Sequence, residues 1–366
     1  MIHDNNINPP IEGIPLLKGT TFTKEKISDA RNRNKMLMLS LETSNICNLR
    51  CIYCFNDAGR KKEDELTIYE YFRIIDEAID LGVKTVTIAG AGEPFSDPNL
   101  YKILQYLAKK GIYTVVYTNQ TLITNEKAKE LFQLNLSIMG TLNSFNESLQ
   151  NKLFGNIPWG YKKMLEGLQN LMNAGFNDSV PTRLGIDCPV FDQNYDEIPE
   201  IFRFARQNNI YPEISTLFLT GRAKTFDLKG ISIENERELV GKLCSIDKNE
   251  FGIILQPTPP FLTGSKCDRL YYNFVVNVIG DVLPCYGTEI KIGNIREKSV
   301  KELWNHEFLI KVRSIDKYMK GKCKSCEYSA DCFGCPVRTY AKTGDFFGEY
   351  IDCWKETNNK LLNSNV

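Results

Sequence analysis

The chain has few histidines and lacks a long apolar run. Only His3 and His306 occur among 366 residues. This scarcity disfavours a histidine-based triad, acid–base pair or metal site, so proton transfer would use Asp, Glu, Tyr, Lys or Cys. No stretch approaches the roughly 18 apolar residues of a membrane span. Residues 1–10 are polar and lack the apolar segment of a secretion signal. We therefore expect a cytoplasmic protein without a membrane partner.

The sequence also lacks an excess of charge of either sign. Lys and Arg together number 45, and so do Asp and Glu. A neutral balance provides no net field to attract nucleic acid, and we interpret the short basic runs Arg31–Lys35 and Arg60–Lys62 as solvated faces. We therefore predict no nucleic-acid partner. The length predicts two or three domains.

Cysteine, by contrast, is abundant, and ten of the twelve cysteines fall in two groups. A chain of this size buries a large core without disulfides, so we interpret the groups as metal-bound thiolates in a reducing compartment. The first group is Cys47, Cys51 and Cys54, spaced x3 and x2. Three thiolates can hold three irons of a cubic 4Fe–4S cluster and leave the fourth iron free to react. A zinc site would need a fourth ligand, and three metal-free cysteines are the remaining alternative.

The region from residue 36 to 220 alternates strand-like and helix-like segments. Six such repeats predict an α/β fold with parallel strands and outer helices. They are too few for a closed eight-stranded barrel, so we predict a partial (β/α)6 barrel whose site lies at the carboxyl ends of the strands. The expected strands are Met36–Leu41, Thr85–Ala89, Tyr113–Tyr117, Leu134–Met139, Thr182–Ile186 and Glu213–Leu219. The expected helices are Ile68–Leu81, Asn99–Lys110, Asn125–Phe132, Tyr161–Ala174 and Tyr195–Asn208.

Beyond Gly221 the pattern changes. A helix is expected over Glu234–Leu243, a β-hairpin over Tyr272–Cys285 with Gly-Asp at its turn, and a short helix over Val300–Asn305. The cysteine-dense tail has little apolar periodicity, so we expect metal to organise it. We divide the chain into an irregular extension (1–35), the barrel (36–221), a linker with a helix (222–262) and a cysteine-rich domain (263–366).

The triplet, with Tyr53 before its last cysteine, resembles the radical S-adenosylmethionine (SAM) superfamily, and the tail resembles its SPASM subgroup. The resemblance implies that SAM binds the vacant iron and is cleaved by one electron. The resulting 5′-deoxyadenosyl radical abstracts a substrate hydrogen, while the protein positions and shields the reaction. It also implies a flavodoxin- or ferredoxin-type reductant as a partner.

The resemblance extends to a candidate SAM site. The run Gly90-Ala-Gly92-Glu93-Pro94 resembles the GGEP loop of the family, with Ala91 where glycine is usual. Its small residues expose backbone carbonyls, and Glu93 can accept a hydrogen bond from the SAM ammonium. Gly221-Arg222-Ala223 resembles a turn near the adenine. Further SAM contacts are implied for Thr118, Asn119, Ser137 and Arg183, each of which has a purely structural alternative.

Seven cysteines of the tail follow the SPASM order, with one internal spacing of x2 where x3 is usual. The resemblance implies two auxiliary 4Fe–4S clusters, which makes three clusters in all. Residues 255–266 contain no cysteine, so one auxiliary cluster would have an open or non-cysteine ligand, with Asp268 as a candidate. Two zinc knuckles are the alternative, but seven cysteines do not divide into closed sets of four. One cluster would use Cys323, Cys326, Cys332 and Cys353, and the other Cys267, Cys285 and Cys335.

Cys188 and Asp187 lie at the expected carboxyl end of the fifth strand. A thiol at the barrel mouth could donate a hydrogen atom to a substrate radical, and Asp187 could act as a base. A buried, inert cysteine is the alternative for Cys188.

Three functions compete. The first is a radical SAM oxidoreductase that dehydrogenates a small molecule or natural-product intermediate. The second is a peptide maturase that crosslinks or epimerises a ribosomal peptide, and the third is a non-enzymatic zinc or iron–sulfur protein. The auxiliary clusters favour oxidation because they provide a path for the substrate electron. About 35 residues without a winged-helix pattern precede the first expected strand, which favours a small molecule.

Overall fold

The computed structural model describes residues 16–226, 228–263, 267–330 and 332–355. Six parallel strands form its centre in the order β6-β5-β4-β3-β2-β1, and the described strands do not pair β6 with β1. The α/β partial barrel is therefore confirmed. The strands are β1 (Met38–Leu41), β2 (Thr85–Ile88), β3 (Tyr113–Thr118), β4 (Leu136–Thr141), β5 (Leu184–Val190) and β6 (Tyr211–Thr216).

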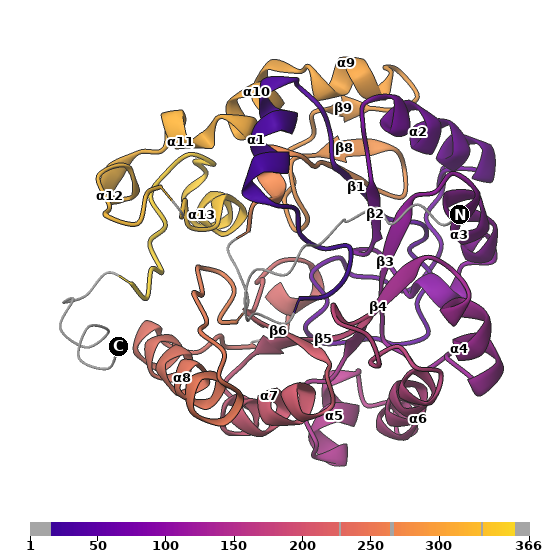
Figure 1. The fold of residues 1–366 in the computed structure, drawn as a ribbon, viewed down its shortest axis with the longest axis vertical. Coiled ribbons are helices and arrows are strands. Elements are labelled where there is room, and N and C mark those ends of the chain that lie inside the picture. Colours follow the sequence, from indigo (N-terminus) through magenta and orange to yellow (C-terminus); the bar gives the residue numbers. More distant parts are fainter. Residues whose placement is uncertain (1–15, 227, 264–266, 331, 356–366) are drawn as a thin grey trace.

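The barrel helices stand around the outside of the strands (Figure 1). Helix α2 shows why they begin where they do. The Thr67 hydroxyl accepts a hydrogen bond from the Glu70 N–H, and the Glu70 carboxylate accepts one from the Thr67 N–H, which forms a capping box. The helices are α2 (Ile68–Asp80), α3 (Leu100–Lys109), α4 (Asn125–Phe132), α5 (Glu147–Leu153), α6 (Gly160–Asn173), α7 (Ile198–Gln207) and α8 (Ile233–Ile246).

The expectation of an irregular extension is wrong for part of it. Helix α1 spans Lys24–Asn32, and Thr23 caps it; residues 1–15 lie outside the described residues. Leu17 and Phe22 pack into one apolar cluster with Tyr113 and Met139 of the barrel strands. Helix α1 buries only two of its residues, so its sequence carries little of the apolar periodicity that predicts a helix.

The predicted hairpin forms, and it continues the barrel sheet. Strand β7 (Val275–Val276) pairs in parallel with β1, and β8 (Asp281–Leu283) pairs antiparallel with β7. Strand β9 (Gly293–Asn294) follows as the ninth of the sheet. The cysteine-rich segment is thus joined to the first barrel strand by backbone hydrogen bonds.

The tail curves from β9 toward α8, across the side of the barrel that the sheet leaves open (Figure 1). Arg338 donates a hydrogen bond to the Thr216 hydroxyl at the end of β6, and Arg237 of α8 donates to the Trp354 carbonyl at 3.0 Å. The tail therefore contacts the β6 edge of the parallel sheet and helix α8. Its helices are α9 (Val300–Trp304), α10 (Glu307–Arg313), α11 (Ile315–Tyr318), α12 (Gly321–Lys324) and α13 (Pro336–Thr343).

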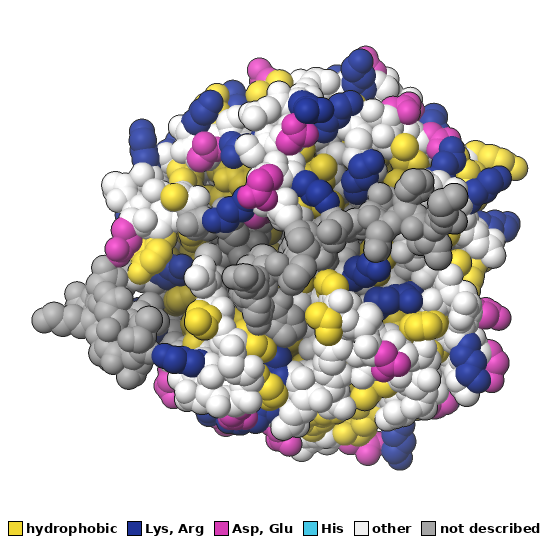
Figure 2. Space-filling view, in the orientation of Figure 1, with side chains coloured by type: hydrophobic (Ala, Val, Ile, Leu, Met, Phe, Trp, Pro, Cys, Tyr) yellow, Lys and Arg dark blue, Asp and Glu magenta, His cyan; other side chains and the backbone are white. Residues whose placement is uncertain are grey.

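Charges of both signs are interspersed over the face of the molecule in Figure 2. Among the described residues, no helix has the length and apolar character that a membrane crossing requires.

Candidate active site

A cavity of about 300 Å³ opens at the carboxyl ends of the barrel strands. Its wall has two parts, because residues from the barrel loops face residues from the cysteine-rich segment. The barrel contributes Cys47, Cys51, Cys54, Gly90, Gly92, Glu93, Thr118, Asn119, Thr141, Asp187 and Glu213, and the C-terminal segment contributes Cys267, Arg269, Cys285 and Cys335.

The triplet loop after β1 presents three thiols to this cavity. Burial raises the pKa of Cys47 to about 11 and raises the pKa of Cys51 well above its ordinary value; the charge of Glu93 raises the pKa of Cys47 further, and the neighbouring thiols raise both. The Leu49 N–H points at the Cys47 sulfur at 3.4 Å. Such thiols stay protonated unless a metal replaces their protons.

These features fit a cluster held by three thiolates. In the described part of the chain, no three His, Cys, Asp or Glu side chains are arranged to hold a single metal ion. The fit therefore rests on three thiols that share one cavity wall. Arg222 braces the loop, since its guanidinium donates hydrogen bonds to the carbonyls of Cys51 (3.1 Å) and Ala58.

Glu93 links the second and third strand loops. Its carboxylate accepts hydrogen bonds from the Thr118 hydroxyl at 2.6 Å and from the Asn119 N–H at 2.7 Å. Burial raises its pKa, since the side chain is only 2% exposed. Gly92 must be glycine, because a Cβ there would lie 1.9 Å from the Ile46 carbonyl oxygen of the triplet loop. The Gly90–Pro94 loop and the triplet loop are therefore packed directly against each other.

Two expected SAM contacts lie away from the cavity. The Ser137 hydroxyl contacts the Tyr113 hydroxyl at 2.9 Å and donates to the Lys18 carbonyl at 2.8 Å. Arg183 donates to the carbonyls of Phe132, Leu134 and Leu136. Ser137 is the second residue of β4, and Arg183 directly precedes β5, so both residues lie at the amino ends of their strands, opposite the cavity. The SAM role of Ser137 and Arg183 is corrected to a structural one.

Cys188, the expected hydrogen donor, does not lie at the cavity. Strand β5 continues to Val190, so Cys188 lies inside the strand, where side chains alternate between the two faces. Asp187 and Pro189 face the cavity, whereas Cys188 is 0% exposed and packs in the core between sheet and helices. A hydrogen-donor role for Cys188 is therefore wrong for this structure, and its thiol is a core group.

Several cavity residues were not anticipated, among them Tyr117, Thr141, Glu213 and Arg269. The sequence carried a signal for Glu213, because Asp187-Cys-Pro and Glu213-Ile-Ser both place polar or small residues at alternate positions of a strand. Tyr117 donates a hydrogen bond to Glu213 at 3.1 Å, and Arg269 donates to the Tyr117 hydroxyl at 3.3 Å. Burial raises the pKa of Asp187 and of Glu213, and the Arg269 charge partly opposes both shifts.

The C-terminal side of the cavity carries three further thiols. Burial raises the pKa of Cys285 to about 12 and of Cys335 to about 11, and it also raises the pKa of Cys267. Asp268, the candidate oxygen ligand, is not among the residues that line this cavity. Backbone N–H groups also point at two tail sulfurs outside the cavity, Tyr350 at Cys323 (3.3 Å) and Gly334 at Cys332 (3.4 Å). The assignment of Cys323, Cys326, Cys332 and Cys353 to a second auxiliary cluster stays a prediction.

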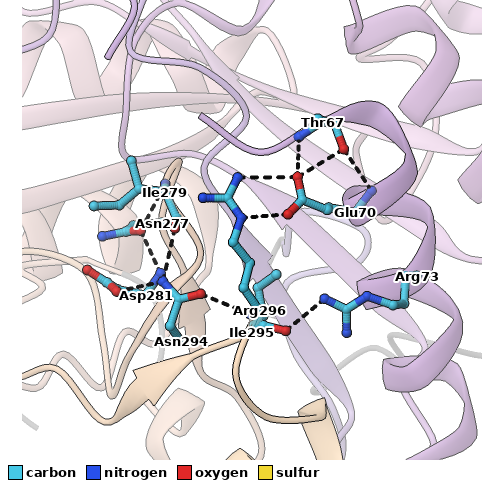
Figure 3. Close-up of polar contacts among 9 residues, drawn as sticks. All are labelled: Thr67, Glu70, Arg73, Asn277, Ile279, Asp281, Asn294, Ile295 and Arg296. Atoms are coloured by element: carbon cyan, nitrogen blue, oxygen red, sulfur yellow. Dashed lines mark hydrogen bonds and ion pairs between the residues drawn. The ribbon is translucent and has the colours of Figure 1, made fainter. Parts of the chain in front are cut away.

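Polar contacts fix this second wall to helix α2 (Figure 3). Arg296, just after β9, pairs with Glu70 at 2.6 Å, and Glu70 simultaneously caps the helix at Thr67. Arg73 donates to the Ile295 carbonyl at 2.7 Å. The same capping box that starts the helix therefore also anchors the segment that follows β9.

The fold and the paired cysteine walls define the class of protein: an α/β partial barrel whose cavity is lined by two sets of thiols suited to bind iron–sulfur clusters. The model of the radical SAM superfamily matches residues 41–205, and that of the iron–sulfur cluster-binding SPASM domain matches residues 267–327. The chain belongs to the radical SAM superfamily and to its SPASM subgroup.

Named relatives have several activities. The chain is 28% identical to the AdoMet-dependent heme synthase of Methanosarcina barkeri over 87% of this chain and 97% of that protein. It is 26% identical to the PqqA peptide cyclase of Bradyrhizobium diazoefficiens over 84% and 83%. The crystal structure of Streptococcus suis SuiB bound to S-adenosylmethionine matches with a TM-score of 0.68 at 22% identity, over 90% of this chain and 80% of that one. This last likeness shows the fold.

Proposed function

We propose that this protein is a radical SAM oxidoreductase that removes a hydrogen atom and an electron from its substrate. A 4Fe–4S cluster on Cys47, Cys51 and Cys54, with SAM bound, would supply the 5′-deoxyadenosyl radical, and a cluster on Cys267, Cys285 and Cys335 would supply an electron acceptor. The observation that carries the proposal is that both cysteine sets line one cavity.

The cavity wall favours oxidation over epimerisation. An epimerase needs a hydrogen-atom donor beside the substrate. Among the described residues, the thiols that line the cavity are the six predicted cluster ligands, and Cys188 packs in the core instead. The wall thus offers sites for electron acceptance and no separate thiol for hydrogen donation.

The chain's own residues position the reactants. Gly90, Gly92 and Glu93 would hold the SAM methionine end, with Thr118 and Asn119 fixing the Glu93 carboxylate. Asp187 would contact the substrate, because its side chain lines the cavity. A cytoplasmic setting and a flavodoxin- or ferredoxin-type reductant complete the proposal.

A small molecule or cofactor precursor is the proposed substrate. The relative named as a heme synthase aligns over nearly its full length, and a cavity of about 300 Å³ falls in the range of small-molecule sites. A ribosomal peptide is the second candidate, supported by the relative named as the PqqA peptide cyclase.

The test uses protein reconstituted anaerobically with iron, sulfide, SAM and dithionite. A low-molecular-mass fraction and a peptide fraction from the source organism are added separately, and 5′-deoxyadenosine is measured above the substrate-free rate. The small-molecule proposal expects stimulation by the first fraction and a product two hydrogens lighter than its precursor. Stimulation by the peptide fraction alone would establish the second candidate. A redox-neutral product would contradict the oxidative assignment.

A further inference from the structure

The cavity contains two adjacent carboxylates from neighbouring strands. Asp187 of β5 is the direct register partner of Glu213 of β6, so their side chains leave the sheet on the same face and at the same depth. Both side chains line the cavity. Like charges held this close are unfavourable unless something positive lies between or beside them.

The protein supplies only part of that positive charge. Arg269 lies within electrostatic reach of both carboxylates, and Tyr117 donates a hydrogen bond to Glu213 at 3.1 Å. The other cavity arginine, Arg222, is already occupied by Asp57 and by backbone carbonyls. One arginine therefore faces two acids.

Asp187 is the less satisfied of the pair. Within the described parts of the chain its carboxylate accepts no hydrogen bond, and burial raises its pKa. Asp187 is half-buried and lines the cavity, and a partly buried carboxylate without a hydrogen-bond partner stabilises the fold little, if at all. A group that costs stability inside a cavity is expected where binding uses it.

The surrounding wall increases the demand for a cation. Cys267 and Cys285 face the same cavity, and thiolates that bind a metal there add negative charge on the side from which Arg269 comes. A substrate carboxylate would be repelled by this arrangement, whereas an ammonium or guanidinium group would restore the charge balance and supply the hydrogen bonds that Asp187 lacks.

We propose that Asp187 and Glu213 form a recognition site for a positively charged group of the substrate, an amine or a guanidine. This inference deepens the proposed function and rests on it for the identity of the bound molecule as a substrate. Asp187 makes the larger contribution, because Tyr117 already bonds Glu213. The same site then explains why an acid that burdens folding is present.

The test measures the binding of three probes of similar size and different charge: benzylamine, benzyl alcohol and benzoate. Each is titrated calorimetrically into the anaerobically reconstituted protein with SAM bound. Benzylamine should bind about tenfold more tightly than benzyl alcohol, and benzoate should bind more weakly than either. Asp187→Asn should remove the preference for benzylamine and leave the affinity for benzyl alcohol within about twofold.

Two further variants complete the design. Glu213→Gln should weaken benzylamine binding less than Asp187→Asn does. Asp192→Asn is the matched control, because that carboxylate lies on the exposed loop just after β5 and its removal should not alter the preference. Asp187→Asn should also raise the melting temperature of the ligand-free protein, by about 2 °C. If the carboxylate were needed for folding, the same substitution would lower the melting temperature.

Equal binding of benzylamine and benzoate by the unmodified protein would overturn the proposal, as would an unchanged preference in Asp187→Asn. A weakened affinity for SAM in that variant, with the probe preference intact, would assign the pair to SAM and also overturn it. Failure of the proposed function appears separately, as absence of 5′-deoxyadenosine formation by the unmodified protein, because probe binding requires no SAM cleavage.

Discussion

The two walls of the cavity are built in opposite ways. The barrel wall takes its three thiols from one loop, Cys47 to Cys54, directly after β1. The opposite wall takes Cys267, Cys285 and Cys335 from three places in the C-terminal segment. A local loop needs one strand to present it, whereas the second wall exists only after the hairpin and the tail have packed against the barrel.

The anchors of the two walls differ accordingly. Backbone hydrogen bonds hold the triplet loop, from Cys47 to Gly59 at 3.3 Å and from Ile52 to Leu153 at 2.9 Å. The second wall depends on the pairing of β7 with β1 and on the contact between Arg296 and Glu70. We call the contact of β1 with β7, together with the neighbouring ion pair, the seam between the walls. Substitutions in this seam should therefore disturb the second wall and leave the first wall intact.

The largest effect is expected from the barrel wall itself. Changing Cys47, Cys51 and Cys54 together to Ala should remove about four irons and all SAM cleavage, because this triplet supplies the iron with an open position. Iron analysis and chromatography of 5′-deoxyadenosine measure the two effects. Cleavage that persisted in the triple variant would disprove the assignment of the triplet.

The matched experiment on the second wall is Cys285→Ala. It should remove about four irons and product formation while SAM cleavage continues in part, because the site of cleavage lies on the other wall. Cys353→Ala tests the tail set in the same way. If anaerobically purified protein held zinc at these sites, the electron-acceptor role would be abandoned.

Glu42 lies on the seam, and its protonation should change stability. Its N–H donates to the Val276 carbonyl at 3.0 Å, and burial raises its pKa to about 7. A carboxyl whose pKa is raised by folding costs stability as the pH rises from its unfolded pKa of about 4.3 to the folded value. Glu42→Gln removes this cost.

The free energy of unfolding of Glu42→Gln, measured in urea under anaerobic conditions, should therefore exceed that of the unmodified protein. The gap should widen by about 1 kcal/mol between pH 6 and pH 8. Glu63→Gln, an exposed carboxylate, is the control and should show no such trend. A gap that narrowed with rising pH would contradict the buried, protonated state.

Cys188→Ala should have a small effect confined to stability. The side chain is 0% exposed in the core, so its truncation should cost about 1 kcal/mol through a small cavity. Product identity and 5′-deoxyadenosine yield should match those of the control Cys244→Ala. Formation of a different product by Cys188→Ala would show that this thiol takes part in the reaction.

The smallest effect is expected from the surface anchor in Figure 3. A double-mutant cycle of Arg296→Ala and Glu70→Gln should give a coupling of about 0.5–1 kcal/mol, as for a partly exposed ion pair that also holds a cap. The exposed pair of Lys163 with Glu166, within one barrel helix, should give less. The Arg296 variant should lose auxiliary iron before triplet iron on mild heating.

The spacing of residues in the sequence was sufficient to predict those parts of the site that lie within one loop. The triplet and the Gly90–Glu93 loop each follow a strand, and Thr118 and Asn119 lie at the end of β3, so all of them line one cavity at the carboxyl ends of the strands. The expected helix Asn125–Phe132 agrees with the observed bounds. These features depend on a few consecutive residues, whose types and order are visible in the chain.

Only the tertiary structure decided the other features of the site. Which face of the sheet and which end of a strand a residue occupies depends on where strand pairing begins. Strand β4 begins two residues later than expected, which places Ser137 at its amino end, and alternation along β5 directs Cys188 to the core and Asp187 to the cavity. The neighbourhood of Asp187, Glu213 and Arg269 joins residues far apart in sequence. It exists because parallel pairing sets the register of β5 and β6 and because the C-terminal segment packs against the barrel mouth, and no local pattern encodes either.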